Sequence, residues 1–368
     1  MASSATFLTI LAVLAIALVS VEASRKAKPG TLCPTALFTF SDSLSDSGNR
    51  YREGMGSGDT LSALAGRDPY GVTYGRPTGR YSDGLLIPDL LISNLRLENL
   101  AIASLSYNGS EFVSLNFGYA GATVIPVQGN QPPYLVHASP ELPASPEEHH
   151  RAIGGDDINF GLAQGGNYVV QVVVPAVVKG LADAIATLYS AGARNVLLFN
   201  MPRADCAPTY LQAFGEYQPG TYHLDKDGCI VEVGELVSVF NSAMQTMAGE
   251  LRQNYTGLNV YYFDWNAANT EVIENMDTYG FTTNLKSCCG GGGQYNCNGG
   301  GLCGCGTANV SYTVCKDPDE YTTFDGVHYT GHFYRIMTDF ILAGQYISPN
   351  VTLQKGCKVI PEEPAGPL

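Results

Sequence analysis

The stretch TFSDSLSDSGN, residues 39–49, directly follows the apolar residues Ala36, Leu37 and Phe38 and contains four serines and two aspartates. A short apolar run that ends in polar residues is typical of a buried strand leading into a turn. Because serine and aspartate are common in turns and at helix caps, this stretch alone does not identify a nucleophile. A hydrolytic role for one of these serines requires a base and an orienting carboxylate elsewhere in the chain.

Two further apolar runs have strand length, NVLLFNMP at residues 195–202 and LNVYYFDW at residues 258–265. Apolar residues recur at helical spacing in residues 175–193 and 233–255, and a last helix is predicted at about residues 330–343. Strands that are continuously apolar and alternate with helices are typical of a parallel sheet covered on both faces. The pattern therefore predicts an α/β fold.

The N-terminus predicts export. Residues 7–20 form an apolar stretch that ends near the sequence Val21-Glu22-Ala23. This length is typical of a secretory signal peptide and is shorter than the roughly 20 residues of a membrane-spanning helix. We therefore expect a signal peptide at residues 1–23 and a soluble, secreted protein without integral membrane association.

Two other features fit an extracellular, oxidising compartment. The ten cysteines are an even number, as a set of disulfides requires. Four Asn-x-Ser/Thr sequons predict N-glycosylation at Asn108, Asn254, Asn309 and Asn350.

Charge and length limit the function classes. The net charge is −14, and no cluster of Lys or Arg is present. Nucleic acids and anionic membranes are bound by basic faces, so neither is an expected partner. The length allows one large α/β domain or two smaller ones, and we expect a single domain at residues 24–352 followed by a C-terminal tail at residues 353–368.

Two regions lack a regular pattern. Residues 124–151 are rich in Pro, Gln, His and Glu and predict a polar loop. Residues 288–306, CCGGGGQYNCNGGGLCGCG, combine glycines and cysteines but follow no strand, so a dinucleotide site is not predicted. Zinc is conceivable there, but an exported chain favours disulfides, and no metal or cofactor is implied. Cys206 with Cys229 is the preferred pair because both flank one loop, and the other pairings stay open.

A candidate base and carboxylate occur together in FDGVHYT, residues 324–330. The chain has six histidines, and only His328 has a carboxylate in such a tight local frame, Asp325. In a turn before a helix, this spacing lets the carboxylate reach Nδ1 of the imidazole and leaves Nε2 for catalysis. Asp325 and His328 are therefore a candidate carboxylate and base for a nucleophile elsewhere in the chain, and Ser43 read alone is a turn residue.

Five short motifs occur in an order that resembles the plant GDSL esterase/lipase family of the SGNH hydrolase superfamily. They are FSDSLSDSGN (40–49), YGRPTGRYSDGLLIPDLL (74–91), NFGYAGAT (116–123), IGGDDINFG (153–161) and FDGVHYT (324–330). The resemblance implies a flavodoxin-like three-layer α/β/α sandwich with a mostly parallel five-stranded sheet. It also implies an ester hydrolase that forms an acyl-enzyme and needs no cofactor.

The same resemblance assigns roles to residues. Ser43 would be the nucleophile, His328 the general base and acid, and Asp325 the carboxylate that orients His328. The oxyanion hole would be formed by the N–H groups of Ser43 and Gly121 and by the side chain of Asp156. Implied substrates are small or polysaccharide-linked acyl esters, acetyl esters above all, and choline esters, in the apoplast or cell wall.

The chain departs from the family pattern at Asp156, where the family has Asn. An ionised carboxylate would repel a developing oxyanion, so two alternatives are open: Asp156 is neutral and donates a hydrogen bond, or it turns away. Ser41 also replaces the glycine of the family name. The polar residues before Ile153 make a poor strand, so either the sheet is shortened there or another segment substitutes.

Two other functions compete with ester hydrolysis. An acyltransferase would use the same triad, with an alcohol in place of water. A binding or cell-wall protein with weakened catalysis is favoured by Asp156 and opposed by the retention of Ser43, Asp325 and His328.

Overall fold

The structure is a computed structural model of the 368-residue chain that describes residues 15–18, 30–55, 60–97, 101–107, 114–125, 155–216 and 220–355. The strands are β1 (Ala15–Leu18), β2 (Thr31–Leu32), β3 (Phe38–Phe40), β4 (Ile102–Ala103), β5 (Leu115–Asn116), β6 (Asn195–Phe199), β7 (Asn259–Phe263), β8 (Thr283–Ser287), β9 (Cys289–Gly290), β10 (Thr313–Val314), β11 (Tyr321–Thr323), β12 (Ile347–Ser348) and β13 (Thr352–Leu353). The helices are α1 (Asn49–Gly54), α2 (Thr60–Leu64), α3 (Ile87–Leu95), α4 (Gly155–Leu162), α5 (Gly166–Tyr168), α6 (Val174–Ser190), α7 (Pro208–Tyr210), α8 (Val231–Asn254), α9 (Trp265–Glu274), α10 (Met276–Tyr279) and α11 (Gly331–Ala343). Three strands were predicted, and they correspond to β3 (predicted at 36–40), β6 (195–202) and β7 (258–265). Three helices were also predicted, and they correspond to α6 (predicted at 175–193), α8 (233–255) and α11 (330–343).

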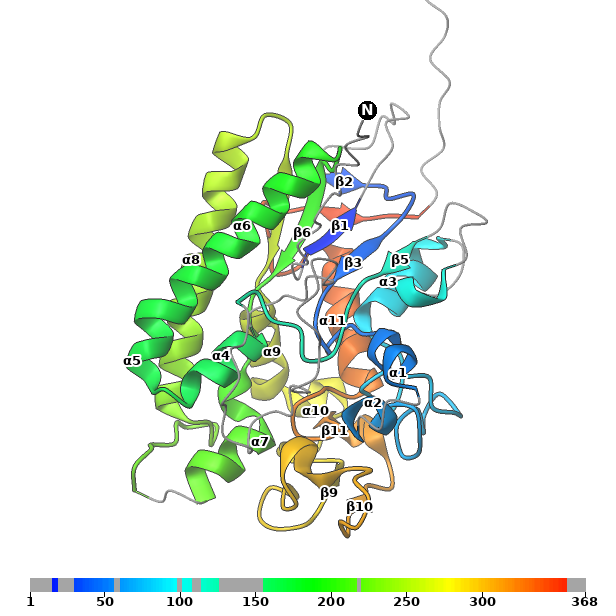
Figure 1. Ribbon diagram of the computed structural model, residues 1–368, viewed down its shortest axis with the longest axis vertical. Helices are drawn as coiled ribbons and strands as arrows, with labels where there is room; N and C mark the ends of the chain where they lie inside the picture. The colour runs from blue at the N-terminus through cyan, green and yellow to red at the C-terminus, as the bar shows by residue number, and fades with distance from the viewer. Residues whose placement is uncertain are drawn as a thin grey trace, which may run out of the picture.

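The central sheet has the strand order β12-β7-β6-β1-β3-β5-β4 (Figure 1). Pairings β6–β7, β3–β5 and β4–β5 are parallel, whereas β1 is antiparallel to both of its neighbours and β12 is antiparallel to β7. The expected sheet of five mostly parallel strands is thus corrected to seven strands of mixed direction in the described residues.

β1 fills the gap between β3 and β6. Its residue Ala15 lies opposite Phe40 on one side and Leu198 on the other. The residues directly before Ile153, whose poor strand pattern left two alternatives, lie outside the described residues, and in the described ones β1 takes the place between β3 and β6. That segment belongs to the predicted signal peptide, so cleavage after Ala23 would remove β1 from the sheet.

Alternate residues of β6 bury their side chains on opposite faces, as the two-residue period of a strand requires. Val196 and Leu198 join a core with α6 and α8, whereas Leu197 and Phe199 join a core with α3, α9 and α11. Burying one such side chain contributes about 1.5–3 kcal/mol. Helices therefore cover both faces of the sheet, which agrees with the predicted α/β fold (Figure 1).

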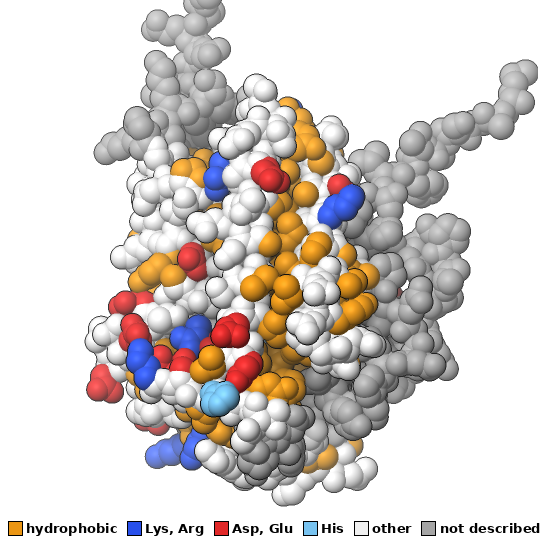
Figure 2. All heavy atoms as spheres, turned by 90° about the vertical axis from the view of Figure 1, so that its left-hand side faces the viewer, with side chains coloured by type: hydrophobic (Ala, Val, Ile, Leu, Met, Phe, Trp, Pro, Cys, Tyr) orange, Lys and Arg blue, Asp and Glu red, His pale blue; other side chains and the backbone are white. Residues whose placement is uncertain are grey.

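The helical run Gly166–Ser190 is long and apolar enough to cross a membrane, and it is the one such helix in the described residues. Val177, Leu181 and Ile185 of this run are fully buried against the sheet, as expected for a core helix of a sandwich. Its outer face adds to an apolar band seen in Figure 2, and exposed side chains of this region include Tyr168 and Val172.

Four disulfides lie within the described residues. The predicted pair Cys206–Cys229 is confirmed, and the others are Cys288–Cys315, Cys289–Cys305 and Cys297–Cys303. The cysteines of the segment 288–306 are thus all bonded, which favours the disulfide interpretation over zinc. The described residues include only the first two positions of the predicted polar loop at 124–151, and the structure describes the predicted tail only as far as residue 355.

Candidate active site

Ser43 lies in the turn that follows β3, at the carboxyl end of this strand. The backbone N–H of Ser45 donates to the carbonyl oxygen of Asp42 at 3.2 Å, which closes the turn. Ser41, Ser45 and Ser47 are buried, whereas Ser43 is half-buried. Ser43 is therefore the serine of this stretch that a substrate can reach.

The loop that carries Gly121 runs alongside the Ser43 turn. The N–H of Tyr119 donates to the carbonyl of Ser41 at 2.8 Å, which continues the parallel pairing of β3 with β5 beyond the strand ends. Gly121 has a φ of +83°, in the left-handed region that favours glycine. Neither the N–H of Ser43 nor that of Gly121 donates a hydrogen bond within the described part of the chain, so both can bind an oxyanion.

Asp46 holds these two loops together. Its Oδ1 accepts hydrogen bonds from the N–H groups of Gly48 at 2.7 Å and Asn49 at 2.6 Å, and its Oδ2 accepts from the N–H of Ala120 at 2.9 Å. The side chain of Asn49 in turn donates to the carbonyl of Asn116 at 2.8 Å. These bonds are buried, so the geometry between the Ser43 turn and the Gly121 loop is fixed.

Asp325 and His328 form a buried pair in the loop between β11 and α11. Nδ1 of His328 lies 2.7 Å from Oδ2 of Asp325, and the two side chains are 3% and 0% exposed. Oδ1 of Asp325 accepts from the backbone N–H groups of Val327 at 3.1 Å and His328 at 2.9 Å. A carboxylate acceptor at Nδ1 means that Nδ1 carries the proton and Nε2 is the basic nitrogen.

Asp42, the neighbour of Ser43, lies close enough to His328 for the charges of the two side chains to interact. Burial raises the pKa of Asp42 to about 6, while the hydrogen bond from Leu44 and the charge of His328 oppose the shift. Nε2 of His328 is buried and has no hydrogen-bond partner within the described residues, so it does not bond Ser43 in this conformation. Hydrogen bonds between nucleophile and base often form only when substrate binds.

Asp156 lies in the first turn of α4, beside Asp42. Its Oδ1 accepts a long hydrogen bond of 3.5 Å from Asn159, and its Oδ2 is buried without a partner among the described residues. Burial, followed by the negative charges of Asp42 and Asp157, raises the pKa of Asp156 well above its usual range. Asp157 itself accepts hydrogen bonds from two backbone N–H groups, which stabilise its ionised form.

Two tyrosines that the motifs did not single out contact the Asp325–His328 pair. The hydroxyl of Tyr70 donates to Oδ2 of Asp325 at 2.8 Å. The ring of Tyr81 lies over the imidazole of His328, with 5.2 Å between ring centroids. Tyr81 falls within the motif at 74–91, but nothing in the spacing of either tyrosine indicates a contact with residues more than 240 positions away.

The motif at 74–91 also holds the loop that follows His328. Ser82 donates to the carbonyl of Tyr329 at 3.0 Å, and Asp83 accepts from the N–H of Gly331 at 2.9 Å. This motif therefore fixes the start of α11, directly after the histidine.

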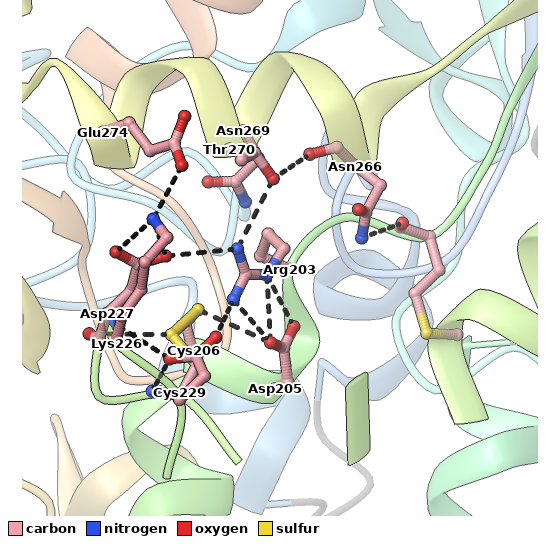
Figure 3. A network of polar contacts seen from close by, with 12 residues as sticks. Arg203, Asp205, Cys206, Lys226, Asp227, Cys229, Asn266, Asn269, Thr270 and Glu274 are labelled. Atoms are coloured by element: carbon pink, nitrogen blue, oxygen red, sulfur yellow. Dashed lines mark hydrogen bonds and ion pairs between the residues drawn. A yellow bond between two sulfur atoms is a disulfide. The ribbon is translucent and has the colours of Figure 1, made fainter. Parts of the chain in front are cut away.

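A second polar network surrounds Arg203, in the loop after β6 (Figure 3). Arg203 pairs with Asp205 at 2.8 Å and with Asp225 at 3.0 Å, next to the Cys206–Cys229 disulfide. Asp205 and the two sulfur atoms lie close together, but disulfide sulfurs are not the thiolates that bind metals. The network is structural and joins this loop to α9.

Three of the four sequons are described, and their asparagines Asn254, Asn309 and Asn350 are exposed. Asn108 lies outside the described residues.

A half-buried serine at the end of a strand and a buried His–Asp pair are the residue types that a serine hydrolase requires. The family model of GDSL-like lipases and acylhydrolases matches residues 37–341. The chain is 31% identical to acetylajmalan esterase 2 of Rauvolfia serpentina, over 89% of this chain and 93% of the relative. It is 29% identical to the GDSL esterase/lipase ENOD8 of Medicago truncatula, over 88% of this chain and 89% of the relative.

The chain belongs to the GDSL-like lipase/acylhydrolase family. It is a hydrolase of the carboxylesterase/lipase type, and its substrates are esters.

Proposed function

We propose that this protein is a secreted serine carboxylesterase that forms an acyl-enzyme on Ser43. Ser43 Oγ attacks the ester carbonyl while Nε2 of His328 takes its proton, and Asp325 orients the imidazole and stabilises its charged form. His328 then protonates the leaving alcohol, and a water molecule activated by His328 hydrolyses the acyl-enzyme. The observation that carries this proposal is the buried Asp325–His328 pair, whose Nε2 has no other partner within the described residues.

The oxyanion is bound by the N–H groups of Ser43 and Gly121 and by a neutral Asp156. The support for a neutral carboxyl is its burial beside Asp42 and Asp157 and its unpaired Oδ2 within the described chain. A protonated carboxyl group donates a hydrogen bond as the family's Asn does, and an ionised one would oppose the reaction.

Acetyl esters, small or attached to polysaccharides, are the proposed substrates. One relative with 31% identity is named an acetylajmalan esterase, which supports an acetyl group as the acyl part. The net charge of −14 also favours cationic substrates such as choline esters, because an acidic protein attracts cations over distance.

We further propose that the protein is exported through residues 1–23 and glycosylated at Asn108, Asn254, Asn309 and Asn350, in the apoplast or cell wall. Four bonded cysteine pairs and three exposed sequon asparagines in the described residues support an oxidising, extracellular location.

Hydrolysis of p-nitrophenyl acetate by the purified protein tests the proposed reaction. We expect turnover by the wild type and none by Ser43→Ala, with Ser190→Ala, an exposed serine at the end of α6, as the matched control. Adding a primary alcohol and quantifying the new ester separates a hydrolase from an acyltransferase. If the wild type and Asp156→Asn are both inactive on all acyl esters tested, the binding-protein alternative replaces this proposal.

A further inference from the structure

We propose that Tyr70 is a positioning residue for the catalytic carboxylate, and that the disulfide-bonded segment 288–306 holds Tyr70 and Asp325 in register. This inference rests on the proposed roles of Ser43, Asp325 and His328. It gives a function to the cysteine- and glycine-rich segment, which has no other role in the proposed reaction.

The contact itself is direct and buried. The Tyr70 hydroxyl donates to Oδ2 of Asp325 at 2.8 Å, and both residues have no exposed surface. The same oxygen faces Nδ1 of His328 at 2.7 Å, while Oδ1 accepts from two backbone N–H groups. Four donors therefore fix the plane of the carboxylate, and Tyr70 is the one that comes from outside the 325–328 turn.

The hydroxyl of Tyr70 remains a donor at all working pH values. Burial, followed by the negative charge of Asp325, raises the pKa of Tyr70 well above its usual value. Hydrogen bonds to a charged acceptor are the strong ones in proteins. This bond draws negative charge away from Oδ2, so it also limits how strongly Asp325 stabilises protonated His328.

The Tyr70 ring is held by the disulfide-bonded segment. Tyr70 belongs to a buried cluster with Cys288, Cys289 and Cys305. A Cβ atom on Gly306 would lie 3.5 Å from the ring, so the backbone of this glycine packs directly against it. The ring also makes an edge contact with Phe324, the residue before Asp325, at 5.4 Å between centroids.

The same segment holds the strand that leads to Asp325. The N–H of Cys289 donates to the carbonyl of Phe324 at 2.7 Å, and the N–H of Cys288 donates to the carbonyl of Thr323 at 3.1 Å. Figure 1 shows β9 and β10 next to β11 at one end of the molecule, near α2, which is close in sequence to Tyr70. One cross-linked segment thus supports both partners of the Tyr70–Asp325 hydrogen bond.

The test compares Tyr70→Phe with Tyr262→Phe, using kcat and KM for p-nitrophenyl acetate across pH and active-site titration with a fluorophosphonate. Tyr262 is the matched control because its buried hydroxyl donates to a backbone carbonyl at 3.1 Å, within the α8 side of the sandwich. For Tyr70→Phe we expect kcat to fall roughly tenfold with little change in KM. We also expect the acid limb of kcat/KM to move to higher pH, since the freed carboxylate stabilises the imidazolium form of His328.

A purely structural role for Tyr70 predicts a different result. Unchanged kinetics, or a lower kcat with an unmoved acid limb, would overturn the inference. The titration separates this failure from failure of the proposed function: if the wild type is not labelled at Ser43, the triad assignment is wrong whatever Tyr70→Phe does.

Discussion

Gly326 packs directly against the sulfur of Cys303, so that a Cβ atom on Gly326 would collide with the Cys297–Cys303 disulfide. Gly326 follows Asp325 immediately, and its φ of +86° is in the left-handed region. The disulfide-bonded segment therefore lies against the catalytic loop itself as well as against Tyr70.

This contact predicts that Gly326→Ala lowers both stability and activity. The matched control is Gly257→Ala, because Gly257 has a similar φ of +76° but open space around its Cα. The control should lose about 1–2 kcal/mol from backbone strain alone. Gly326→Ala should lose a further ~1–3 kcal/mol from overpacking, and its kcat should fall. Denaturant unfolding and kinetics measure both, and equal stability losses in the two variants would contradict the packing account.

Asp156 predicts an activity that is lost as pH rises. The pKa of Asp156 is raised, so its neutral, donating form persists above the usual range of a carboxyl group and disappears when the carboxyl ionises. We expect the kcat/KM of the wild type to decline as pH rises through this raised pKa and that of Asp156→Asn to show no such decline. The exposed Asp183→Asn is the control for a simple change in charge. Identical pH profiles for the wild type and Asp156→Asn would refute a neutral Asp156 in the oxyanion hole.

Stability is predicted to be greatest in weak acid. The folded-state pKa of Asp42 is raised from 3.8 to about 6, so folding favours its protonated form. Its favourable contribution is present below pH 3.8 and is lost as pH rises through about 6. This single group accounts for a change on the order of 3 kcal/mol. Melting temperatures measured from pH 4 to about 8 test this, and a Tm that rises across that range would count against it.

The disulfides predict separate effects on catalysis and on stability. Cys289–Cys305 and Cys206–Cys229 close segments of similar length, 16 and 23 residues, so each should stabilise the fold by about 3 kcal/mol. Replacing Cys289 and Cys305 by serine should also lower kcat, because this bond supports Tyr70. Replacing Cys206 and Cys229 should leave kcat unchanged. Kinetics at a temperature where both variants are folded distinguishes the two, and equal kcat values would argue against the supporting role.

The N-terminal segment can be either cleaved or retained, and the two forms differ in measurable ways. Cleavage after Ala23 predicts a secreted protein whose first residue is Ser24 and whose sheet lacks β1. Retention of the segment predicts that Ala15–Leu18 stays between β3 and β6. Intact mass and N-terminal sequencing of the secreted protein measure which form exists, and hydrogen exchange at residues 196–198 reports whether that edge of β6 is paired.

Much of the fold follows from local patterns. The apolar run at 195–199 predicts β6, and the helical spacing of Val177, Leu181 and Ile185 predicts α6, because burial on a sheet imposes those periods. The pairing of β1 between β3 and β6 was not predictable, since it joins residues about 180 positions apart in sequence. The predicted number and direction of the strands are therefore wrong, because both depend on long-range pairing in the sheet.

Part of the candidate site could likewise be predicted from local sequence, and part could not. Asp325 and His328 are close in sequence, and the turn between them predicts their hydrogen bond. The identification of Ser43 rests on the resemblance to a family, because no local sequence rule relates this residue to His328. Tyr70 was missed altogether, since its bond to Asp325 depends on how the disulfide-bonded segment packs.

The most direct test of the central claim is the mass of the covalent intermediate. The protein should be treated with a fluorophosphonate, or rapidly quenched with p-nitrophenyl acetate, and the modified residue identified by peptide mass spectrometry. The account predicts one adduct, on Ser43, which is absent in Ser43→Ala and forms far more slowly in His328→Ala. An adduct on another residue, or ester hydrolysis that persists in Ser43→Ala, would contradict it.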